Sequence, residues 1–412
     1  MKVCVIGSGG REHALAHVLA RSADVVVTPG NPGIPGSVDT APEALDADLY
    51  VVGPEVPLVD GVADRLRAAG KRVFGPGGAG AQLEGSKAWM KALLVAAGVP
   101  TAGYGSFTDE SEAVAFLRSL PGPWVVKTDG LAAGKGVLVT DSLAEATHDV
   151  RAKLAGESFG AAGRTVVIEE ALTGPELSVL ALCDGKRAVP LAPAQDYKRV
   201  GDGDAGPNTG GMGAYSPVPF VDGGLIGDVM DRFVEPTLAE LRRRDIDYRG
   251  VLYGGLMLTP EGPRLLEYNV RFGDPEAQVV LPRLDPDQCD LLELLGECAS
   301  GHLHSEPVFV ADAAVTVVLA TDGYPASPRT GDVIEGIDKA RDAGATVFCA
   351  GVGSDGSGRL VTSGGRVVNV TGFGPDLDAA RDRAYTAVAC IAWPGVHYRT
   401  DIARDVARQN RS

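Results

Sequence analysis

A fourteen-residue segment, Leu265 to Gln278, constrains this chain more than any other. Its first part carries enough apolar and aromatic side chains to predict a strand. Because successive side chains of a strand point to opposite faces, Glu267, Asn269 and Arg271 project from one side. Burying a carboxylate, an amide and a guanidinium together is costly unless each group has a partner. The segment therefore predicts a buried strand that faces a ligand or an ion.

The three polar side chains suit different partners. The oxygens of Glu267 and Asn269 are the donors that a hard cation such as magnesium prefers. The guanidinium of Arg271 suits a carboxylate or a phosphate held by two parallel hydrogen bonds. The alternative is a half-exposed edge strand with a surface Glu–Arg pair. The Gly-Asp-Pro turn that closes the strand at once favours a binding site.

Length and charge limit what the chain can be. Its 412 residues predict two to four domains, and 45% hydrophobic against 22% charged residues is typical of a globular protein. The net charge of 38 − 54 = −16 argues against a nucleic-acid partner. No run approaches the roughly twenty apolar residues of a membrane span, and the N-terminus reads as a short strand rather than a signal peptide. Six cysteines without zinc spacing favour reduced thiols in the cytoplasm.

The first hundred residues alternate strands and helices. This alternation predicts a doubly wound parallel sheet, so we expect an α/β domain over 1–100. The expected strands are Val3–Ile6, Val25–Thr28, Leu49–Val52 and Arg72–Phe74, and the expected helices are Glu12–Arg21, Leu58–Ala69 and Lys87–Ala97, the last capped by Ser86.

A second α/β region begins near Pro100 and is expected to reach residue 326, with a subdomain at about 122–190. Its expected strands are Trp124–Lys127, Val137–Thr140, Thr165–Glu170, Glu176–Leu182, Arg187–Pro190, a hairpin of Val251–Leu258 with Arg264–Tyr268, and Ala313–Ala320. Its expected helices are Ser111–Ser119, Leu143–Ala155, Pro275–Leu281 (stopped by Pro282) and Cys289–Gly301. A last small unit, 327–412, is expected to hold strands at Thr346–Gly351, Leu360–Thr362 and Val367–Thr371 and a helix at Leu377–Ala392.

The stretch from Pro190 to Ser216 has no convincing period. It contains six glycines and the adjacent basic pair Lys198 and Arg199. A loop of this length inside a compact domain is either functional or disordered. Asp196 and Lys198, which lie soon after a strand, favour a functional loop.

Glycine-rich loops follow the first strands. Gly7-Ser8-Gly9-Gly10 opens the first helix, where backbone amides and the helix dipole favour an anion. A dinucleotide fold would have glycine where Glu12 stands and an acidic residue about twenty positions later. We therefore expect the phosphate of a smaller substrate there rather than NAD. Further loops at 30–33 and 53–58 follow the next strands, where open α/β sheets hold ligands.

A second glycine-rich segment, Lys127 to Gly136, links two strands. It is not a Walker loop, because no Gly-Lys is followed by Ser or Thr and a helix. Such a hairpin can fold over nucleotide phosphates as a lid, and the alternative is a mobile surface hairpin. The strand that ends at Glu169 and Glu170 can present free backbone groups to an adenine edge, and Glu176 can hold ribose hydroxyls.

Taken together, these segments resemble the ATP-grasp superfamily and, more narrowly, the phosphoribosylamine–glycine ligase family. The resemblance covers nearly the whole chain. It rests on GSGGREHAL near the start, NPG at 31–33, GPEVPLVDG at 53–61, KTDGLAAGKGV from 127, QDYKRVGDGDAGPNTGGMGAYSP from 195 and EYNVRFGDPEAQ from 267. The RFGDPE sequence after a Glu-x-Asn strand is the most specific of these.

The resemblance implies an activity and its partners. The family joins glycine to 5-phosphoribosylamine through glycyl phosphate, with ATP as cosubstrate and Mg²⁺ or Mn²⁺ as cofactor, and yields glycinamide ribonucleotide, ADP and phosphate in purine biosynthesis. The family fold implies a doubly wound N-terminal sheet, central ATP-grasp domains with a lid, and a small α/β C-terminal domain. A monomer or weak homodimer is expected.

The resemblance also implies residue roles. Glu267 and Asn269 would hold the metal, and the expected catalytic residues are Arg271, Lys127, Lys198 and Asp196. ATP is expected at Lys127, Gly130, Gly134, Lys135, Gly136, Glu169, Glu170, Leu172 and Glu176. The substrates are expected at Gly7, Gly9, Gly10, Asn31, Gly33, Pro54, Glu55, Thr209, Gly211, Met212 and Arg271.

The chain departs from the family pattern at three places. The strand Val251–Leu258 lacks the acidic metal ligand of many ATP-grasp enzymes, so phosphates and water would complete the coordination. Tyr197 and Thr128 stand where the family often has histidine and alanine, which puts a proton-handling role at 197 in doubt.

Other functions remain open from the residues alone. Another ATP-grasp ligase or a carboxylase would use bicarbonate in place of glycine. A nucleotide-binding regulator without catalysis would be expected to have lost a metal ligand, and a dehydrogenase is disfavoured by Glu12.

Overall fold

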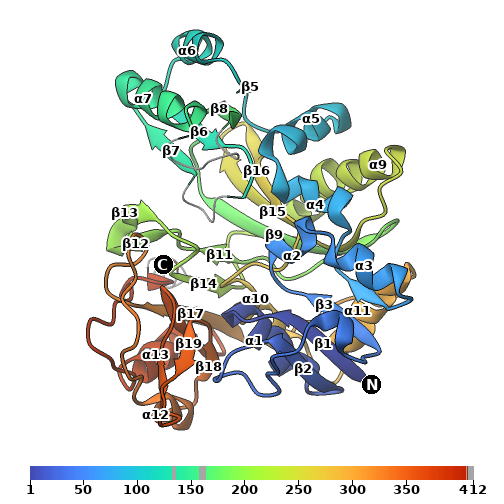
Figure 1. Cartoon of the computed structure of the whole chain (residues 1–412), viewed down its shortest axis with the longest axis vertical. Coiled ribbons are helices and arrows are strands. Elements are labelled where there is room, and N and C mark those ends of the chain that lie inside the picture. Colours follow the sequence, from blue (N-terminus) through green and yellow to red (C-terminus); the bar gives the residue numbers. More distant parts are fainter. Residues whose placement is uncertain (132–135, 157–163, 405, 407–412) are drawn as a thin grey trace.

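The computed structural model describes residues 1–131, 136–156, 164–404 and 406. The described residues form four sheets of four or five strands and two two-stranded ribbons (Figure 1). None of their helices is long and apolar enough to span a bilayer.

The N-terminal sheet is parallel throughout, with strand order β2-β1-β3-β4. This confirms the predicted doubly wound sheet. Its strands have apolar side chains buried on both faces, as expected when helices cover both faces of a parallel sheet. Its elements are β1 (Lys2–Gly7), α1 (Gly10–Leu19), β2 (Asp24–Pro29), a 3-10 turn Pro42–Ala44, β3 (Leu49–Val52), α2 (Glu55–Val59), α3 (Val62–Ala68), β4 (Val73–Phe74), α4 (Gly78–Gly85) and α5 (Lys87–Ala97).

Two details of this region differ from the prediction. The expected helix Leu58–Ala69 is two helices, α2 and α3, because Gly61 takes a left-handed conformation with φ of 76° between them. Helix α4 was not predicted. Ser86 caps α5 as expected, its hydroxyl accepting a hydrogen bond from the amide of Trp89.

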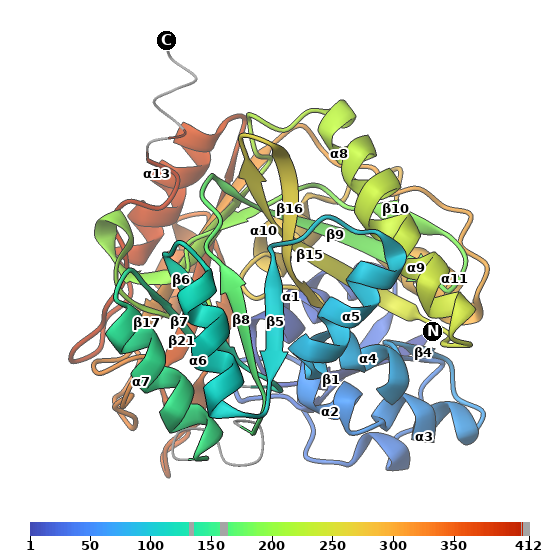
Figure 2. The same cartoon turned by 90° about the horizontal axis from the view of Figure 1, so that it is seen from above.

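An antiparallel sheet with order β5-β8-β6-β7 follows. Figure 2 shows α6 and α7 side by side on its outer face, and these helices share with the sheet a small hydrophobic core separate from the main one. The unit, which we term the lid sheet, thus packs around its own core. Its elements are β5 (Tyr104–Phe107), not predicted, α6 (Glu110–Ser119), β6 (Trp124–Thr128), β7 (Val137–Thr140), α7 (Leu143–Leu154) and β8 (Val166–Glu170).

The central sheet has the order β10-β9-β15-β16, and its strands are β9 (Glu176–Asp184), β10 (Ala188–Pro190), β15 (Arg249–Thr259) and β16 (Gly262–Asn269). The predicted hairpin is confirmed as β15 and β16. The expectation of a buried strand was wrong in part: β16 is an edge strand with mostly half-buried residues, and Arg271 lies beyond its end.

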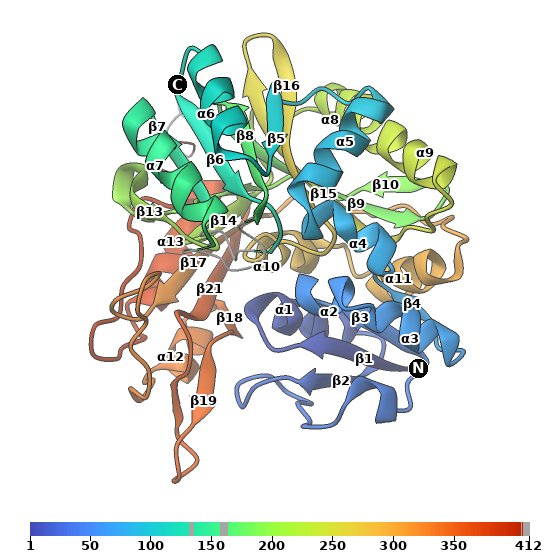
Figure 3. The same ribbon diagram turned by 45° about the horizontal axis from the view of Figure 1, so that its top comes forward.

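The C-terminal sheet draws on distant parts of the chain, with order β11-β14-β17-β21-β18. Its strands are β11 (Gln195–Asp196), β14 (Gly213–Ser216), β17 (Ala313–Ala320), β18 (Thr346–Cys349) and β21 (Arg366–Gly374), with α12 (Ile337–Asp342) and α13 (Leu377–Val388) alongside. Helix α13 packs on β17 and β21. Figure 3 places this sheet beside the N-terminal unit, where α1 contacts β18.

The stretch 190–216 is folded rather than structureless. It contains β11 and β14 and a ribbon of β12 (Arg199–Gly201) and β13 (Ala205–Asn208), joined by the 3-10 turn Asp202–Asp204. A second ribbon pairs β19 (Val352–Ser354) with β20 (Leu360–Thr362). These pairings are too short to give a readable period in the sequence.

The remaining helices are α8 (Gly223–Val229), a π-helical turn Met230–Val234, α9 (Glu235–Arg243), α10 (Ala277–Val280), a 3-10 turn Leu281–Arg283 and α11 (Leu291–Ser300). They differ in what they cover: α11 contacts β9 and β15 of the central sheet, whereas α10 contacts α1 and the C-terminal strands β14 and β17. The stretch α8–α9 was not predicted. The predicted helix Pro275–Leu281 is found as the shorter α10, which ends before Pro282 as expected; Pro282 then stands in the first turn of the 3-10 segment, where its missing N–H is not needed.

Candidate active site

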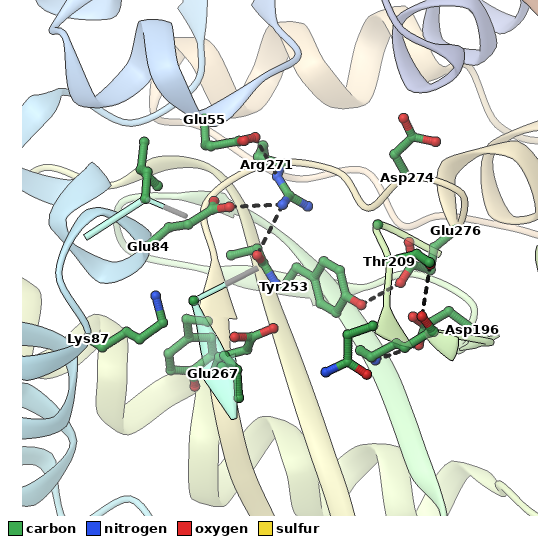
Figure 4. A pocket seen from close by; sticks show the side chains of 18 of the residues that line it. Glu55, Glu84, Lys87, Asp196, Thr209, Tyr253, Glu267, Arg271, Asp274 and Glu276 are labelled. Carbon is green, nitrogen blue, oxygen red and sulfur yellow. Dashed lines mark hydrogen bonds and ion pairs between the residues drawn. The ribbon is translucent and has the colours of Figure 1, made fainter. Parts of the chain in front are cut away.

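One cavity of about 420 Å³ lies where the lid sheet, the central sheet, the N-terminal helices and the C-terminal sheet meet. Charged side chains dominate its wall. Its acids are Glu55, Glu84, Asp196, Glu267, Asp274 and Glu276, and its bases are Arg11, Lys87, Lys198, Arg271 and Arg366. Figure 4 shows Lys87 and Glu267 at one side of the cavity and Asp274, Thr209 and Asp196 at the other. We term the first side, where Lys87 Nζ also donates to Gly130 O at 3.0 Å, the nucleotide end, and the second the acceptor end, after the ligands that the sequence leads us to expect there.

Glu267 and Asn269 both line the cavity from β16. The carboxylate of Glu267 makes no hydrogen bond or ion pair within the described residues, while the Asn269 Oδ1 accepts a hydrogen bond from Arg271 Nη2 at 3.1 Å. Two oxygen donors on one wall fit a hard cation whose other ligands are phosphate and water. The described residues contain no cluster of three or more His, Cys, Asp or Glu side chains that could hold a metal without such help.

Arg271 lies between two carboxylates from the N-terminal unit. Its Nε lies 3.2 Å from Glu55 Oε2 and its Nη2 lies 2.9 Å from Glu84 Oε1. Burial raises the pKa of Glu84, whereas for Glu55 the nearby Arg271 and Arg11 outweigh burial and lower the pKa. The alternative of a surface Glu–Arg pair is not found, since Arg271 and Glu267 form no ion pair within the described residues. One N–H of Arg271 Nη1 still has no partner among the described residues, because that nitrogen donates only to Phe272 O.

Lys198 lies between two other carboxylates. Its Nζ is 2.8 Å from Asp196 Oδ1 and 2.6 Å from Glu176 Oε2. Burial lowers the pKa of Lys198, but these two carboxylates outweigh burial and raise the pKa well above its ordinary value. Lys198 is therefore a fixed positive charge on the cavity wall.

Lys127 is buried beneath the wall and does not line the cavity. Its Nζ lies 3.0 Å from Glu169 Oε1, and the buried Lys91 lies 3.1 Å from the other carboxylate oxygen. Despite burial, the two lysines lower the pKa of Glu169. The Glu169 carboxylate is thus committed to these lysines, and Glu170 accepts a hydrogen bond from the Gly103 amide at 2.8 Å.

The N-terminal glycine loop is packed against the chain's own side chains. The Gly9 amide donates to Glu12 Oε2 at 2.6 Å, so an internal carboxylate occupies the position expected for an anion. A Cβ on Gly7 would lie 2.6 Å from Glu12, and one on Gly53 only 2.1 Å from it. Because Gly7 and Gly53 have no side chains, the Glu12 side chain fits between them. This space allows a glutamate at the position where a dinucleotide fold has glycine.

Asn31 joins the N-terminal unit to the C-terminal sheet. Its amide nitrogen donates to Ser8 O at 2.8 Å and Ala350 O at 3.0 Å, and its oxygen accepts from Gly33 N at 2.8 Å. A Cβ on Gly33 would lie 2.4 Å from Cys349 Sγ. The Asn-Pro-Gly segment therefore packs between the N-terminal sheet and the C-terminal sheet.

The structure brings part of the expected site together. The expected residues that line the cavity are Glu55, Gly130, Gly136, Asp196, Lys198, Thr209, Glu267, Asn269 and Arg271. The expected residues that do not line it are Gly7, Gly9, Gly10, Asn31, Gly33, Pro54, Lys127, Glu169, Glu170, Leu172, Glu176, Gly211 and Met212. Gly134 and Lys135 lie outside the described residues.

Sequence reasoning missed several cavity residues. They are Arg11, Glu84, Lys87, Tyr253, Asp274, Glu276, Tyr324 and Arg366. Arg11, Asp274 and Glu276 stand inside quoted segments and could have been found there. Arg366 and Tyr324 have no local signal, since tertiary folding alone brings them to the cavity.

The two unusual positions have structural surroundings. Tyr197 is not a cavity residue: its hydroxyl accepts a hydrogen bond from the Ala403 amide at 2.9 Å, and the Arg399 guanidinium lies 4.7 Å from its ring centre. Burial raises the pKa of Tyr197 to about 12, which does not suit proton transfer near neutral pH. Thr128 is fully buried.

Family models match most of the chain. Residues 1–84 match the N domain of phosphoribosylglycinamide synthetase, residues 85–277 its ATP-grasp (A) domain and residues 314–405 its C domain. Among curated relatives, the phosphoribosylamine–glycine ligase of Streptomyces coelicolor is 49% identical over 428 residues, covering 99% of this chain and 100% of the relative. That of Mesorhizobium japonicum is 47% identical, and both chains are covered completely.

Solved structures agree with these matches. The phosphoribosylamine–glycine ligase of Thermotoga maritima superposes with a TM-score of 0.87 at 35% identity, covering 98% of this chain and 100% of that one. A biotin carboxylase domain from Hydrogenobacter thermophilus superposes with a TM-score of 0.70 at 16% identity, covering 96% of this chain and 91% of that one. At that identity the second likeness concerns the fold alone.

Proposed function

The chain belongs to the phosphoribosylglycinamide synthetase family, and from this premise we propose that its cavity joins glycine to 5-phosphoribosylamine at the expense of ATP. The reaction is the step of purine biosynthesis that yields glycinamide ribonucleotide, ADP and phosphate. One observation carries the assignment to this cavity: a carboxylate–amide pair, Glu267 and Asn269, shares the same wall with the anchored guanidinium of Arg271.

ATP is proposed to lie at the nucleotide end, between the lid sheet and the central sheet. Gly130 and Gly136 border this end, and Lys198 supplies a fixed positive charge at the neighbouring wall. Lys127, buried beneath the cavity wall, would contribute positive charge toward the ATP phosphates, and Glu169 would hold its ammonium group in place. The adenine is proposed to lie against the strand end at 169–172, with Glu176 near the ribose.

A divalent cation, Mg²⁺ or Mn²⁺, is proposed at Glu267 and Asn269. Both oxygens face the cavity, and their chemistry suits a hard cation. When bound, the cation would neutralise the charge of the ATP phosphates.

Glycine and the sugar amine are proposed to lie at the acceptor end. Glu55 and Glu84 hold the Arg271 guanidinium by Nε and Nη2, which leaves Nη1 to orient the glycine carboxylate. Thr209 and Gly211, with Met212 behind them, would border the glycine. Asp196 and Lys198 would face the reacting groups from the opposite wall.

Two steps complete the reaction. A carboxylate oxygen of glycine attacks the γ-phosphorus, the bond from that phosphorus to the bridging oxygen breaks, and ADP leaves. The sugar amine then attacks the carbonyl carbon of glycyl phosphate, the carbon–oxygen bond breaks, phosphate leaves, and the amine gives up a proton. Since charge develops on the transferring phosphoryl group, the fixed cations must already be in place.

We also propose that the protein acts in the cytoplasm as a monomer or weak homodimer. The −16 net charge argues against a nucleic-acid partner. For the domains we propose 1–100 as the N-terminal unit, 101–326 as the ATP-grasp region with its lid, and 327–412 as the C-terminal unit.

A coupled assay of ADP release tests the function. ADP should appear only when metal, ATP, glycine and 5-phosphoribosylamine are all present, and glycinamide ribonucleotide should form in equal amount. ADP release supported by bicarbonate without glycine would identify a carboxylase instead. Release with ATP and metal alone would contradict the coupling of the two steps.

A further inference from the structure

Arg366 is a residue of the C-terminal sheet that reaches the acceptor end of the cavity. Its Nη1 donates to three carbonyl oxygens, those of Gly210 at 2.7 Å, Gly211 at 3.3 Å and Asp274 at 2.7 Å. Its Nη2 lies 3.1 Å from the Asp274 carboxylate. One guanidinium thus bridges the glycine loop before β14 and the turn after β16, which lie more than sixty residues apart in sequence.

The loop and the turn are also in direct contact. A Cβ on Gly210 would lie 3.0 Å from Arg366 Cζ, and one on Gly211, whose φ is 111°, would lie 2.5 Å from the Pro275 ring. Two further hydrogen bonds hold this contact. Tyr324 Oη accepts from the Gly210 amide at 3.1 Å, and Gln278 donates to the second oxygen of Asp274 at 2.7 Å.

Two arginines from distant parts of the chain, Arg11 and Arg366, converge on the turn after β16, which also carries Arg271. Arg11 Nη1 and Arg271 Nη1 donate to Phe272 O at 3.1 and 3.2 Å, while Arg366 holds the carbonyl and carboxylate of Asp274. The turn carries Arg271 itself, so its position sets the position of that guanidinium. The planar fork matters here because Nη1 of Arg366 contacts the carbonyl oxygens while its Nη2 contacts the Asp274 carboxylate, and the single nitrogen of a lysine does not occupy both places.

We propose that Arg366 is a positioning residue for the acceptor end: it fastens the 209–211 loop to the Asp274 turn and thereby fixes the walls that receive glycine and the sugar amine. This inference rests on the proposed function. It gives the C-terminal sheet a part in the reaction, since that sheet delivers the side chain that joins two walls of the cavity. Within the described residues, Arg366 has no hydrogen bond or ion pair with the nucleotide end, so we expect ATP binding not to depend on it.

Arg366→Ala, measured by full steady-state kinetics, tests the proposal. We expect kcat/KM for glycine to fall on the order of a hundredfold, as expected when a reacting group is misplaced by about an ångström. The apparent KM for ATP should stay within about twofold, because a removed contact changes only the substrate it serves. Millimolar guanidinium, well below denaturing concentration, should restore part of the glycine activity of Arg366→Ala by filling the vacated position.

Arg359→Ala is the matched control. Arg359 belongs to the same C-terminal region, is largely exposed and pairs only locally with Asp355. This variant should keep normal kinetics and gain nothing from guanidinium. If Arg366→Ala does not fold, Arg366→Lys replaces it with the same expected loss for glycine.

Two results would overturn the proposal. One is a normal glycine requirement in either Arg366 variant. The other is a parallel rise in the KM values for ATP and glycine without rescue by guanidinium, which would indicate general loss of structure. Failure of the wild-type and Arg359→Ala proteins to use glycine would contradict the proposed function and not this inference.

Discussion

The two ends of the cavity are built differently. Each element of the nucleotide end carries a local sequence pattern: Gly130 and Gly136 belong to the glycine-rich β6–β7 hairpin and Glu267 to the alternating strand β16, although the hairpin and the strand lie far apart in sequence. The acceptor end joins distant parts of the chain, among them Asp196 from β11, Thr209 from the loop before β14, Asp274 from the turn after β16 and Arg366 from the start of β21. The first end can therefore be read from local patterns, whereas the second exists only after the sheets have packed.

The ends also differ in how their charges are held. At the nucleotide end, Glu267 has no ion-pair partner within the described residues and is available to a cation. At the acceptor end, Arg271 and Arg366 are each bound to carboxylates, by distances between 2.9 and 3.2 Å. At the nucleotide end the Glu267 carboxylate is available to a bound cation, whereas at the acceptor end the arginine side chains are already paired with carboxylates of the protein.

Glu267→Gln should give the largest effect and tests whether the nucleotide end depends on an uncommitted carboxylate. We expect turnover to fall by about a thousandfold or more, because the amide weakens cation binding at the ATP phosphates. ADP release and thermal unfolding should be measured together, and the unfolding midpoint should not change. Glu261→Gln, on the exposed turn of the same hairpin, is the control. Near-normal turnover would remove Glu267 from the proposed metal site.

Arg271→Lys should give the next largest effect and tests the fixed network at the acceptor end. We expect kcat/KM for glycine to fall on the order of a hundredfold, because the ammonium keeps the charge but loses the planar fork that contacts Glu55, Glu84 and the proposed glycine carboxylate together. The KM for ATP should change far less. Arg232→Lys, at an exposed helix pair with Asp228, is the control. Equal effects on both substrates would contradict the carboxylate role of Arg271.

His13→Asn should give the smallest effect and concerns the support beneath the acceptor end. His13 Nδ1 accepts a hydrogen bond from the Cys349 amide at 2.8 Å and so links α1 to β18. Burial lowers the pKa of His13 from 6.5 to about 3. Between pH 6.5 and about pH 3, His13 is protonated in the unfolded chain but not in the folded protein. The free energy of unfolding therefore decreases as the pH falls through this range.

Urea unfolding between these pH values measures the effect. The wild type should lose up to about 1.4 kcal/mol per pH unit from this one group, in addition to its other titrations. His13→Asn keeps an acceptor oxygen and should flatten that slope, whereas the exposed His302→Asn should leave it unchanged. An unchanged slope in His13→Asn would show that the folded protein binds the proton.

Local patterns predicted most of the fold. The parallel N-terminal sheet, the β15–β16 hairpin and the cap at Ser86 were all predicted because strand periodicity, glycine turns and capping hydroxyls act over a few residues. The break at Gly61, helix α4 and the stretch α8–α9 were missed. Stretches of this kind have weak local preferences, and packing against neighbouring helices decides their form.

The candidate site likewise has features that the sequence predicted and features that only the tertiary structure shows. The sequence determined the chemistry: a carboxylate, an amide and a guanidinium at alternate positions, with glycine loops and lysines elsewhere. Tertiary structure alone decided that Glu55 and Glu84 anchor Arg271 and that Arg366 reaches the acceptor end. The physical reason is that a hydrogen bond or an ion pair depends on distances of about 3 Å between side chains, and residues hundreds of positions apart reach such distances only when separate sheets pack together.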